Sequence, residues 1–248
     1  MIRWSNISKK PDLGQNEIHV WRVNLNQPVA EINLLKSYLS AEEHDRSASF
    51  HFIRDQNRFI TRRAILRQLL ASYLKIQVEC VRISRGPNGK PFAGNYNERS
   101  KISFSCSQSA DWGLIAIARD IELGVDIEHH RLLTEINHLS DACLSQSEIT
   151  EFLKLPEAMK TRHFLGVWTY KEAFVKAIGK GLSFPFKDIT VSNQPAKLVK
   201  VENNSKAADN WKLLTLDMGS DYSAALAYEN KEATLEYFEW DFCNSKPC

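Results

Sequence analysis

Apolar residues follow two spacings along this chain, and each spacing predicts a different kind of element. In residues 54–75 and 157–178 they recur every three or four positions, which predicts two long amphipathic helices. Short helices are expected at residues 41–49 and 145–153, because a serine near the start of each is followed three residues later by a glutamate, the pattern of a capping box. The chain is therefore predicted to contain a short helix followed by a long helix twice.

A two-residue alternation of apolar and polar positions, bounded by turn residues, predicts the strands. They are expected at residues 17–25, 101–106, 112–118, 123–128, 188–191, 197–201, 211–216, 223–228 and 235–240. Because the strands form groups beside the long helices, we predict the α+β fold class.

The two halves of the chain resemble each other at a nearly constant offset. A shift of 105 residues carries Ser40 onto Ser145, and a shift of 110 residues carries Asp111 onto Asp221. Similar patterns in the same order indicate an internal duplication. We therefore predict a pseudo-dimer of two similar halves, each with an antiparallel sheet packed on a long helix.

The boundary between the halves is expected at a short charged connector, residues 119–123. The first half would then span residues 1–120 and the second residues 121–248. Because the connector is too short for a flexible linker, the halves are expected to pack tightly against each other.

Composition places the chain among ordinary globular proteins. Its 248 residues are 43% hydrophobic and 25% charged, which is enough to bury a sizeable core. The net charge of +2 argues against a general nucleic-acid binder. No apolar run is as long as a membrane span, and the basic N-terminus lacks the apolar segment of a signal peptide.

The five cysteines are odd in number and scattered, without Cys-x-x-Cys spacing. They are Cys80, Cys106, Cys143, Cys243 and Cys248. This distribution argues against a disulfide framework and against a zinc site. We expect a cytoplasmic protein with reduced thiols.

Candidate chemistry is concentrated in one strand and one helix of the second half. Asp126 and Glu128 alternate with β-branched residues, so both side chains are expected on one face of a strand. Glu172 and Lys176 are expected one turn apart on a helix. If strand and helix meet, three carboxylates converge beside a cation, which suits Mg²⁺ held against a phosphate-bearing substrate.

Each segment also has a simpler interpretation. The two strand acids are compatible with the solvent face of an edge strand, and the helix pair with an ordinary surface ion pair. An asymmetry between the halves favours a site, because the positions that align with the three acids at the 105-residue shift hold Trp21, Val23 and Arg67. Only the second half carries the acids.

The first half offers cations instead. Six arginines precede or lie along its long helix: Arg46, Arg54, Arg58, Arg62, Arg63 and Arg67. Lys90 stands between a flexible glycine and a rigid proline, which could hold an ammonium toward a phosphate, although the triplet alone favours a plain surface turn.

Four motifs resemble, in order, those of the surfactin-type 4′-phosphopantetheinyl transferases. They are Gly-Lys-Pro at 89–91, Phe-Ser-Cys-Ser-Gln-Ser at 104–109, Gly-Val-Asp-Ile-Glu at 124–128, and Trp-Thr-Tyr-Lys-Glu-Ala at 168–173 with Lys176. The resemblance implies a pseudo-dimer with coenzyme A bound between the halves. It also implies Mg²⁺-dependent transfer of phosphopantetheine from coenzyme A to a carrier-protein serine, which releases adenosine 3′,5′-bisphosphate.

The resemblance also implies roles for single residues. Asp126, Glu128 and Glu172 would bind Mg²⁺; Glu172 would also draw the proton from the serine, and Lys176 would stabilise or protonate the leaving phosphate. Coenzyme A would be held by a further set of residues, which is Arg46, Arg58, Lys90, Ser107, Gln108 and Lys171.

One position departs from the pattern of that family. Gln108 stands where the family usually has histidine, so a neutral amide replaces a potential cation. We expect weakened binding of coenzyme A from this difference.

Two further function classes remain open at the level of the sequence. One is another Mg²⁺-dependent phosphotransferase or diphosphatase that acts on a free nucleotide, and the other is a non-catalytic carrier-protein binder. The expected partners are an apo acyl or peptidyl carrier protein and coenzyme A, with no nucleic acid and no membrane. A monomer is expected, because an internal pseudo-dimer has less need of a second subunit.

Overall fold

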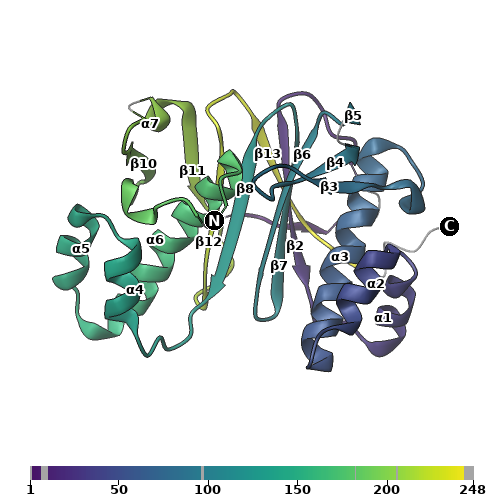
Figure 1. Ribbon diagram of the computed structural model, residues 1–248, viewed down its shortest axis with the longest axis horizontal. Helices are drawn as coiled ribbons and strands as arrows, with labels where there is room; N and C mark the ends of the chain where they lie inside the picture. The colour runs from purple at the N-terminus through teal and green to yellow at the C-terminus, as the bar shows by residue number, and fades with distance from the viewer. Residues whose placement is uncertain (1, 7–10, 96–97, 182, 205, 243–248) are drawn as a thin grey trace.

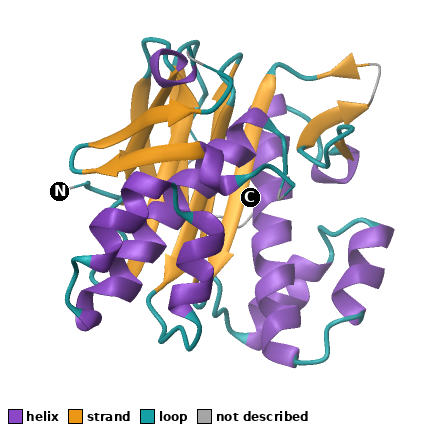
Figure 2. Cartoon of the chain, turned by 60° about the vertical axis from the view of Figure 1, so that its left-hand side comes forward, coloured by secondary structure: helices purple, strands orange, loops and turns teal. Residues whose placement is uncertain are grey.

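Strands lie between two groups of helices in this protein (Figure 1). The computed structural model describes residues 2–6, 11–95, 98–181, 183–204 and 206–242 of the 248. Figure 2 shows the long strands side by side, with helices beside them at two separate places. This mixed architecture confirms the predicted α+β class.

The helices agree closely with the apolar periodicity. They are α1 (Val29–Lys36), α2 (Ala41–Ala48), α3 (Ile53–Leu74), α4 (Ile136–Cys143), α5 (Gln146–Leu153), α6 (Glu157–Ile178) and α7 (Ala207–Asn210), with the 3-10 helices η1 (Val78–Cys80) and η2 (Phe186–Asp188). Both predicted capping boxes are present, at Ser40 with Glu43 and at Ser145 with Glu148. The helices α1, α4 and α7 were not predicted, because each has at most eight residues, too few to show the long apolar periodicity, and none carries a capping box.

All nine predicted strands are present, and four short ones were missed. The strands are β1 (Ser5–Asn6), β2 (Glu17–Asn24), β3 (Ile83–Arg85), β4 (Pro91–Asn95), β5 (Glu98–Arg99), β6 (Ile102–Ser109), β7 (Trp112–Arg119), β8 (Leu123–His129), β9 (Ile189–Asn193), β10 (Ala196–Val201), β11 (Trp211–Thr215), β12 (Tyr222–Glu229) and β13 (Thr234–Glu239). The missed strands β1, β3 and β5 have two or three residues, too few for an alternation to be recognised. Strand β4 begins with a proline and contains a glycine, which both argue against a strand.

Two sheets make up the centre of the molecule. A five-stranded sheet has the order β1-β13-β2-β7-β6, and a three-stranded sheet has the order β11-β12-β8. The last strand, β13, runs parallel to β2, with Phe238 opposite Trp21. Two predictions are therefore wrong. Residues 235–240 do not belong to the sheet of the second half, and the sheet of the first half is not purely antiparallel. Alternation identifies a strand but does not identify its neighbour.

Three apolar cores separate these layers. One lies between α3 and the five-stranded sheet, a second between α6 and the three-stranded sheet, and a third between the two sheets. The side chains of β8 point alternately to its two faces. Leu123, Val125 and Ile127 lie in the core between the sheets. The opposite face of β8, which carries Gly124 and Asp126, is turned toward α6.

The two long helices have the same length and nearly the same buried positions. Each has 22 residues, and a shift of 104 carries ten of the eleven buried positions of α3 onto buried positions of α6. This shift differs by one from the 105 residues that relate the capping boxes. Aligned in this way, the counterpart of Arg67 is Lys171, so the earlier pairing of Arg67 with Glu172 is corrected.

Two further expectations bear on the described residues only. None of the helices there is both long and apolar enough to cross a bilayer. Cys80, Cys106 and Cys143 are free thiols, while Cys243 and Cys248 lie outside the described residues.

Candidate active site at the seam between the sheets

Strand β8 lies unusually close to α6, and a glycine makes this possible. A Cβ atom on Gly124 would lie 2.1 Å from the carbonyl oxygen of Ala173 and 2.4 Å from the backbone nitrogen of Ala177. Any side chain at this position would therefore push strand and helix apart. The close approach brings Asp126, two residues further along β8, against the last turns of α6.

Alternate serines of β6 bridge the seam to β8. Ser105 accepts a hydrogen bond from the backbone nitrogen of Val125 at 3.1 Å. Ser107 donates to Asp126 Oδ1 at 2.7 Å, and Ser109 donates to Glu128 Oε2 at 2.9 Å. The edge strands of the two sheets are thus joined through hydroxyl groups, and the same hydroxyl groups orient two of the candidate acids.

Lys176 of α6 completes the charge cluster. Its ammonium lies 2.6 Å from Asp126 Oδ1 and 3.1 Å from Ser107 Oγ. The Asp126 side chain is buried, whereas the Lys176 side chain keeps 31% of its surface exposed. The solvent-facing edge strand considered as an alternative is therefore wrong for Asp126.

Glu172 sits in the same cluster with an altered acidity. Burial raises its pKa to about 7, and the carboxylates of Asp126 and Glu128 act in the same direction, while Lys176 opposes them. Burial also raises the pKa of Glu128, with Asp126 again adding to the shift. The three carboxylates therefore interact electrostatically, and the ammonium of Lys176 does not cancel the shift in the pKa of Glu172.

The donor set fits a divalent cation by its chemistry. Asp126 Oδ2 is buried and has no hydrogen-bond partner, and the charge of Lys176 does not offset the burial that raises the pKa of Glu172. Hard cations such as Mg²⁺ prefer oxygen donors of this kind. Among the described residues, no group of three or more His, Cys, Asp or Glu side chains has the spacing of a metal site as it stands, and the Lys176 ammonium occupies one side of Asp126.

A cavity of about 500 Å³ extends from Lys176 into the first half. Its walls come from both halves, because Gly179 and Gly181 follow α6 while Phe59 and Phe104 belong to α3 and β6. The cationic side chains among its lining are Arg46, Arg62, Arg63, Arg85, Lys90 and Lys176. With only Glu42 and Glu43 as acids, the lining carries an excess of positive charge and suits a polyanionic ligand.

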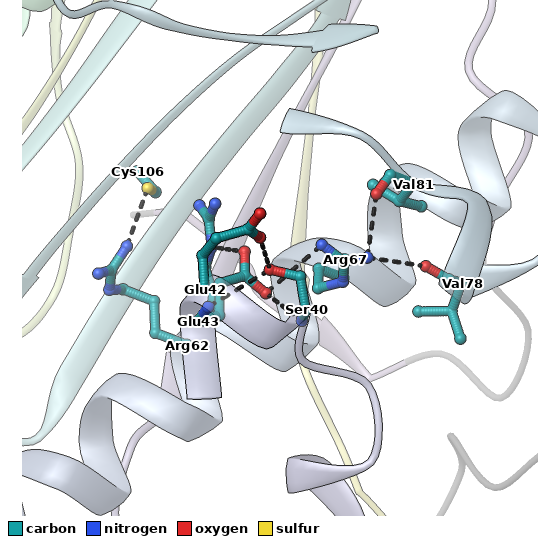
Figure 3. A network of polar contacts seen from close by, with 9 residues as sticks. Ser40, Glu42, Glu43, Arg62, Arg67, Val78, Val81 and Cys106 are labelled. Atoms are coloured by element: carbon teal, nitrogen blue, oxygen red, sulfur yellow. Dashed lines mark hydrogen bonds and ion pairs between the residues drawn. The ribbon is translucent and has the colours of Figure 1, made fainter. Parts of the chain in front are cut away.

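A polar network holds the wall of this cavity in place (Figure 3). Glu43 pairs with Arg63 and, at 3.4 Å, with Arg67. Arg67 also donates to the carbonyl groups of Val78 and Val81, at 3.2 and 2.9 Å. Arg62 instead donates a hydrogen bond to Cys106 Sγ on β6, at 3.1 Å.

The predicted coenzyme A ligands separate into groups in the structure. Arg46 and Lys90 line the cavity. Lys90 is held there by Glu122 and by the carbonyl of Ala177 at 2.5 Å. Ser107 lies against Asp126 and Lys176.

Arg58 and Gln108 lie elsewhere. They line a second hollow of about 410 Å³, which also reaches Glu128 and Arg131. Arg58 is paired with Asp111, and Gln108 accepts a hydrogen bond from Arg62 at 2.5 Å. The acid cluster therefore stands between two hollows, with Lys176 facing the first and Glu128 facing the second.

The prediction that Lys171 grips a phosphate is wrong in this structure. Its side chain is 0% exposed, and its ammonium is bound to Glu148 inside the second half. Burial lowers the pKa of Lys171, and the Glu148 carboxylate opposes that shift. Lys171 and Glu172 are neighbours in sequence, but successive residues of a helix point about 100° apart.

Several residues of the site were not identified from the sequence. Arg62, Arg63 and Arg85 line the cavity. From the sequence, Arg62 and Arg63 were named only as members of an arginine-rich helix, and none of the three was assigned to the site. Ser105 and Ser109 join the seam. Their alternation with Ser107 on β6 was the available signal, because every second residue of a strand faces the same side.

Two family models match this chain in tandem. The model for "4′-phosphopantetheinyl transferase, N-terminal" matches residues 16–120. The model for "4′-phosphopantetheinyl transferase superfamily" matches residues 122–227.

Curated relatives share this description. The 4′-phosphopantetheinyl transferase HetI of Nostoc sp. is 30% identical over 229 residues, which cover 92% of this chain and 94% of that protein. The 4′-phosphopantetheinyl transferase ffp of Bacillus subtilis is 25% identical and covers 74% of this chain and 80% of its own length. Among solved structures, the holo-[acyl-carrier-protein] synthase of Thermotoga maritima has a TM-score of 0.37 at 23% identity, over 44% of this chain and 63% of that one.

Proposed function

Because this chain belongs to the 4′-phosphopantetheinyl transferase superfamily and is an enzyme of that class, we propose that it transfers phosphopantetheine from coenzyme A to a carrier-protein serine. One observation carries the proposal. The Lys176 side chain lines the cationic cavity between the halves, and its ammonium lies 2.6 Å from a buried acid of the cluster. A phosphate-binding cavity and a proton-accepting, cation-binding group of carboxylates are thus contiguous.

Mg²⁺ is the cation that this donor set suits best. Asp126, Glu128 and Glu172 would hold it, with the unpartnered Asp126 Oδ2 as a ready donor. When bound, the ion supplies positive charge that neutralises the diphosphate of coenzyme A.

Glu172 is proposed as the group that receives the proton of the serine hydroxyl, directly or through a water. In the metal-free site, burial raises the pKa of Glu172 to about 7. A cation bound beside it favours the ionised carboxylate, which is the form that can accept a proton. The serine oxygen then forms a bond to the β-phosphorus of coenzyme A. The bond between that phosphorus and the bridging oxygen breaks, and adenosine 3′,5′-bisphosphate leaves with the electron pair.

Lys176 pairs directly with Asp126 and stabilises this leaving charge. Positioning and electrostatic stabilisation supply most of the rate enhancement in phosphoryl transfer, so an ammonium placed at the leaving oxygen is a direct contribution. The remaining phosphates of coenzyme A are proposed to contact the cations of the cavity. These are Arg46, Arg62, Arg63, Arg85 and Lys90.

We assign the chain to the surfactin-type branch with its pseudo-dimeric plan. Three observations support this finer assignment. The two family models meet between residues 120 and 122, where the boundary of the halves was predicted. The buried positions of α3 and α6 coincide at a shift of 104 residues. The motifs at 89–91 and 124–128 both contribute to the site.

Mass spectrometry of an apo carrier protein tests the proposed function. Incubated with this enzyme, coenzyme A and Mg²⁺, the carrier should gain one phosphopantetheine, and adenosine 3′,5′-bisphosphate should appear in equal amount. Consumption of coenzyme A without an acceptor would instead indicate a diphosphatase. Binding of the carrier without any product would indicate a non-catalytic binder. A panel of carriers from fatty-acid, polyketide and peptide pathways identifies the acceptor.

A further inference from the structure

A second ion pair, fully enclosed, lies one residue away from Glu172. The ammonium of Lys171 donates to Glu148 Oε2 at 2.5 Å, to the carbonyl of Cys143 at 2.8 Å and to the carbonyl of Phe186 at 3.0 Å. These acceptors use all three N–H groups of a lysine. Through this one side chain, α6 is tied to α5, to the end of α4 and to η2.

Glu148 adds strand β9 to the hydrogen-bonded segments at this point and also caps the start of its own helix, α5. Its Oε1 accepts from the backbone nitrogen of Val191 on β9 at 2.8 Å, and its Oε2 accepts from the backbone nitrogen of Ser145 at 2.7 Å. We refer to Lys171 and Glu148, with these backbone partners, as the hub. The Glu148 side chain is 4% exposed, so the hub is shielded from solvent.

The first half contains a counterpart of the hub. Arg67 occupies the position of Lys171 at the 104-residue shift, and it pairs with Glu43, which is the capping-box glutamate of α2. Like Lys171, Arg67 also donates to backbone carbonyl groups beside a 3-10 helix, at Val78 and Val81. The residue that follows Arg67 in the sequence is Gln68, whereas the residue that follows Lys171 is the acid Glu172.

The turn of α6 that carries Glu172 is therefore held from two directions. On one side the backbone at Ala173 and Ala177 lies against Gly124 of β8. In a direction about 100° from Glu172, the hub fixes Lys171 to three other segments of the second half. A rotation or a shift of this turn would break the hub and displace the Glu172 carboxylate from Asp126 and Lys176 together.

We propose that the hub of Lys171 and Glu148 positions Glu172 for catalysis by fixing the rotation and height of the α6 turn that carries it. This inference rests on the proposed function, since it assigns Lys171 and Glu148 as positioning residues for the group that takes up the serine proton. Neither side chain lines the coenzyme A cavity.

The test compares Lys171→Met with Arg67→Met, which removes the equivalent cation beside a residue without a catalytic role. For each variant and the wild type, coenzyme A affinity is measured by calorimetry, kcat and KM by carrier loading, and unfolding by urea. Amide hydrogen exchange of residues 168–176 is followed as a readout that does not depend on activity.

Lys171→Met is expected to lower kcat about 100-fold, because small misplacements of catalytic groups have effects of this size, while KM and Kd for coenzyme A stay within about twofold. Exchange in residues 168–176 should accelerate. Arg67→Met should also destabilise the protein. Because Arg67 pairs with Glu43 in the wall of the coenzyme A cavity, its effect on activity should appear as a higher KM for coenzyme A, with exchange in residues 168–176 as in the wild type. Equal losses of kcat in the two variants, or a loss in Lys171→Met that is confined to KM, would overturn the inference.

If Lys171→Met does not fold, the double variant Glu148→Gln/Lys171→Met replaces it under the same criteria, because it leaves no unpaired charge in the interior. An inactive wild type would refute the proposed function but not the positioning, which the exchange rates of α6 then decide. Unchanged exchange in the Lys171 variants would reject the positioning whatever the activity.

Discussion

At the scale of single residues, the site gathers three carboxylates around the ammonium of Lys176. Asp126 and Glu172 are buried near each other, and only Lys176 pairs directly with Asp126. The burial and mutual repulsion that raise the pKa of Glu172 to about 7 oppose its ionisation in the folded state. Such an arrangement costs stability, and functional sites are where such costs are commonly found.

Glu172→Gln is expected to stabilise the protein at alkaline pH in the absence of divalent ions. Between pH 4.5 and 7 the unfolded chain ionises Glu172 while the folded chain retains the proton, so the free energy of unfolding of the wild type falls as pH rises. The gain in the variant should approach about 3 kcal/mol at pH 8 and vanish near pH 4. Urea unfolding at several pH values, with a chelator present, measures this. A gain that does not depend on pH would contradict it.

Gln108→His tests the departure from the family pattern. Gln108 now accepts a hydrogen bond from Arg62, which also lines the cavity, so an added imidazolium beside Arg62 would increase the local positive potential. KM for coenzyme A should fall, more at pH 6 than at pH 8, because histidine titrates in this range. An unchanged or higher KM at both pH values speaks against the expectation.

At the scale of elements, the site depends on the close contact of β8 with α6. Gly124→Ala is expected to destabilise the protein by more than about 3 kcal/mol and to abolish transfer, because the added methyl group meets backbone atoms at 2.1 and 2.4 Å, which cannot move aside alone.

Gly166→Ala, on α6, provides the matched control for this substitution. The nearest atom to its added methyl group would be Asn193 Oδ1 at 3.8 Å, so the methyl group fits. Since alanine favours a helix over glycine, stability should rise by about 0.5–1 kcal/mol. Urea unfolding measures the stability of both variants. Equal changes in stability would show that the contact at Gly124 does not determine the stability of the protein.

Elements were predictable from the sequence because their signals are local. The capping boxes and the apolar periodicity placed α2, α3, α5 and α6, and the alternation of β8 placed Asp126 and Glu128 together. The direction of a helical side chain depends on what surrounds the helix, which the sequence does not show. Lys171 was therefore assigned to the phosphates, although it points into the second half and pairs with Glu148.

At the scale of the whole molecule, the cavity belongs to neither half alone. Arg46 and Arg63 come from the first half, whereas Lys176 and Gly179 come from the second. The pairing of β13 with β2 also ties the end of the chain to the first half. These long-range relations were beyond the reach of local patterns, and a shared site was indicated only by the asymmetry of the acids and by the family resemblance.

The central claim is that Asp126, Glu128 and Glu172 hold one divalent cation beside the cationic cavity. Counting the bound metal ions tests this claim most directly. Mn²⁺, as a paramagnetic substitute for Mg²⁺, is titrated into the enzyme with coenzyme A present, and the free ion is followed by electron paramagnetic resonance. We expect one tightly bound Mn²⁺ per chain in the wild type, and none in Asp126→Asn or Glu128→Gln, with both variants folded. Undiminished binding in these two variants would contradict the claim.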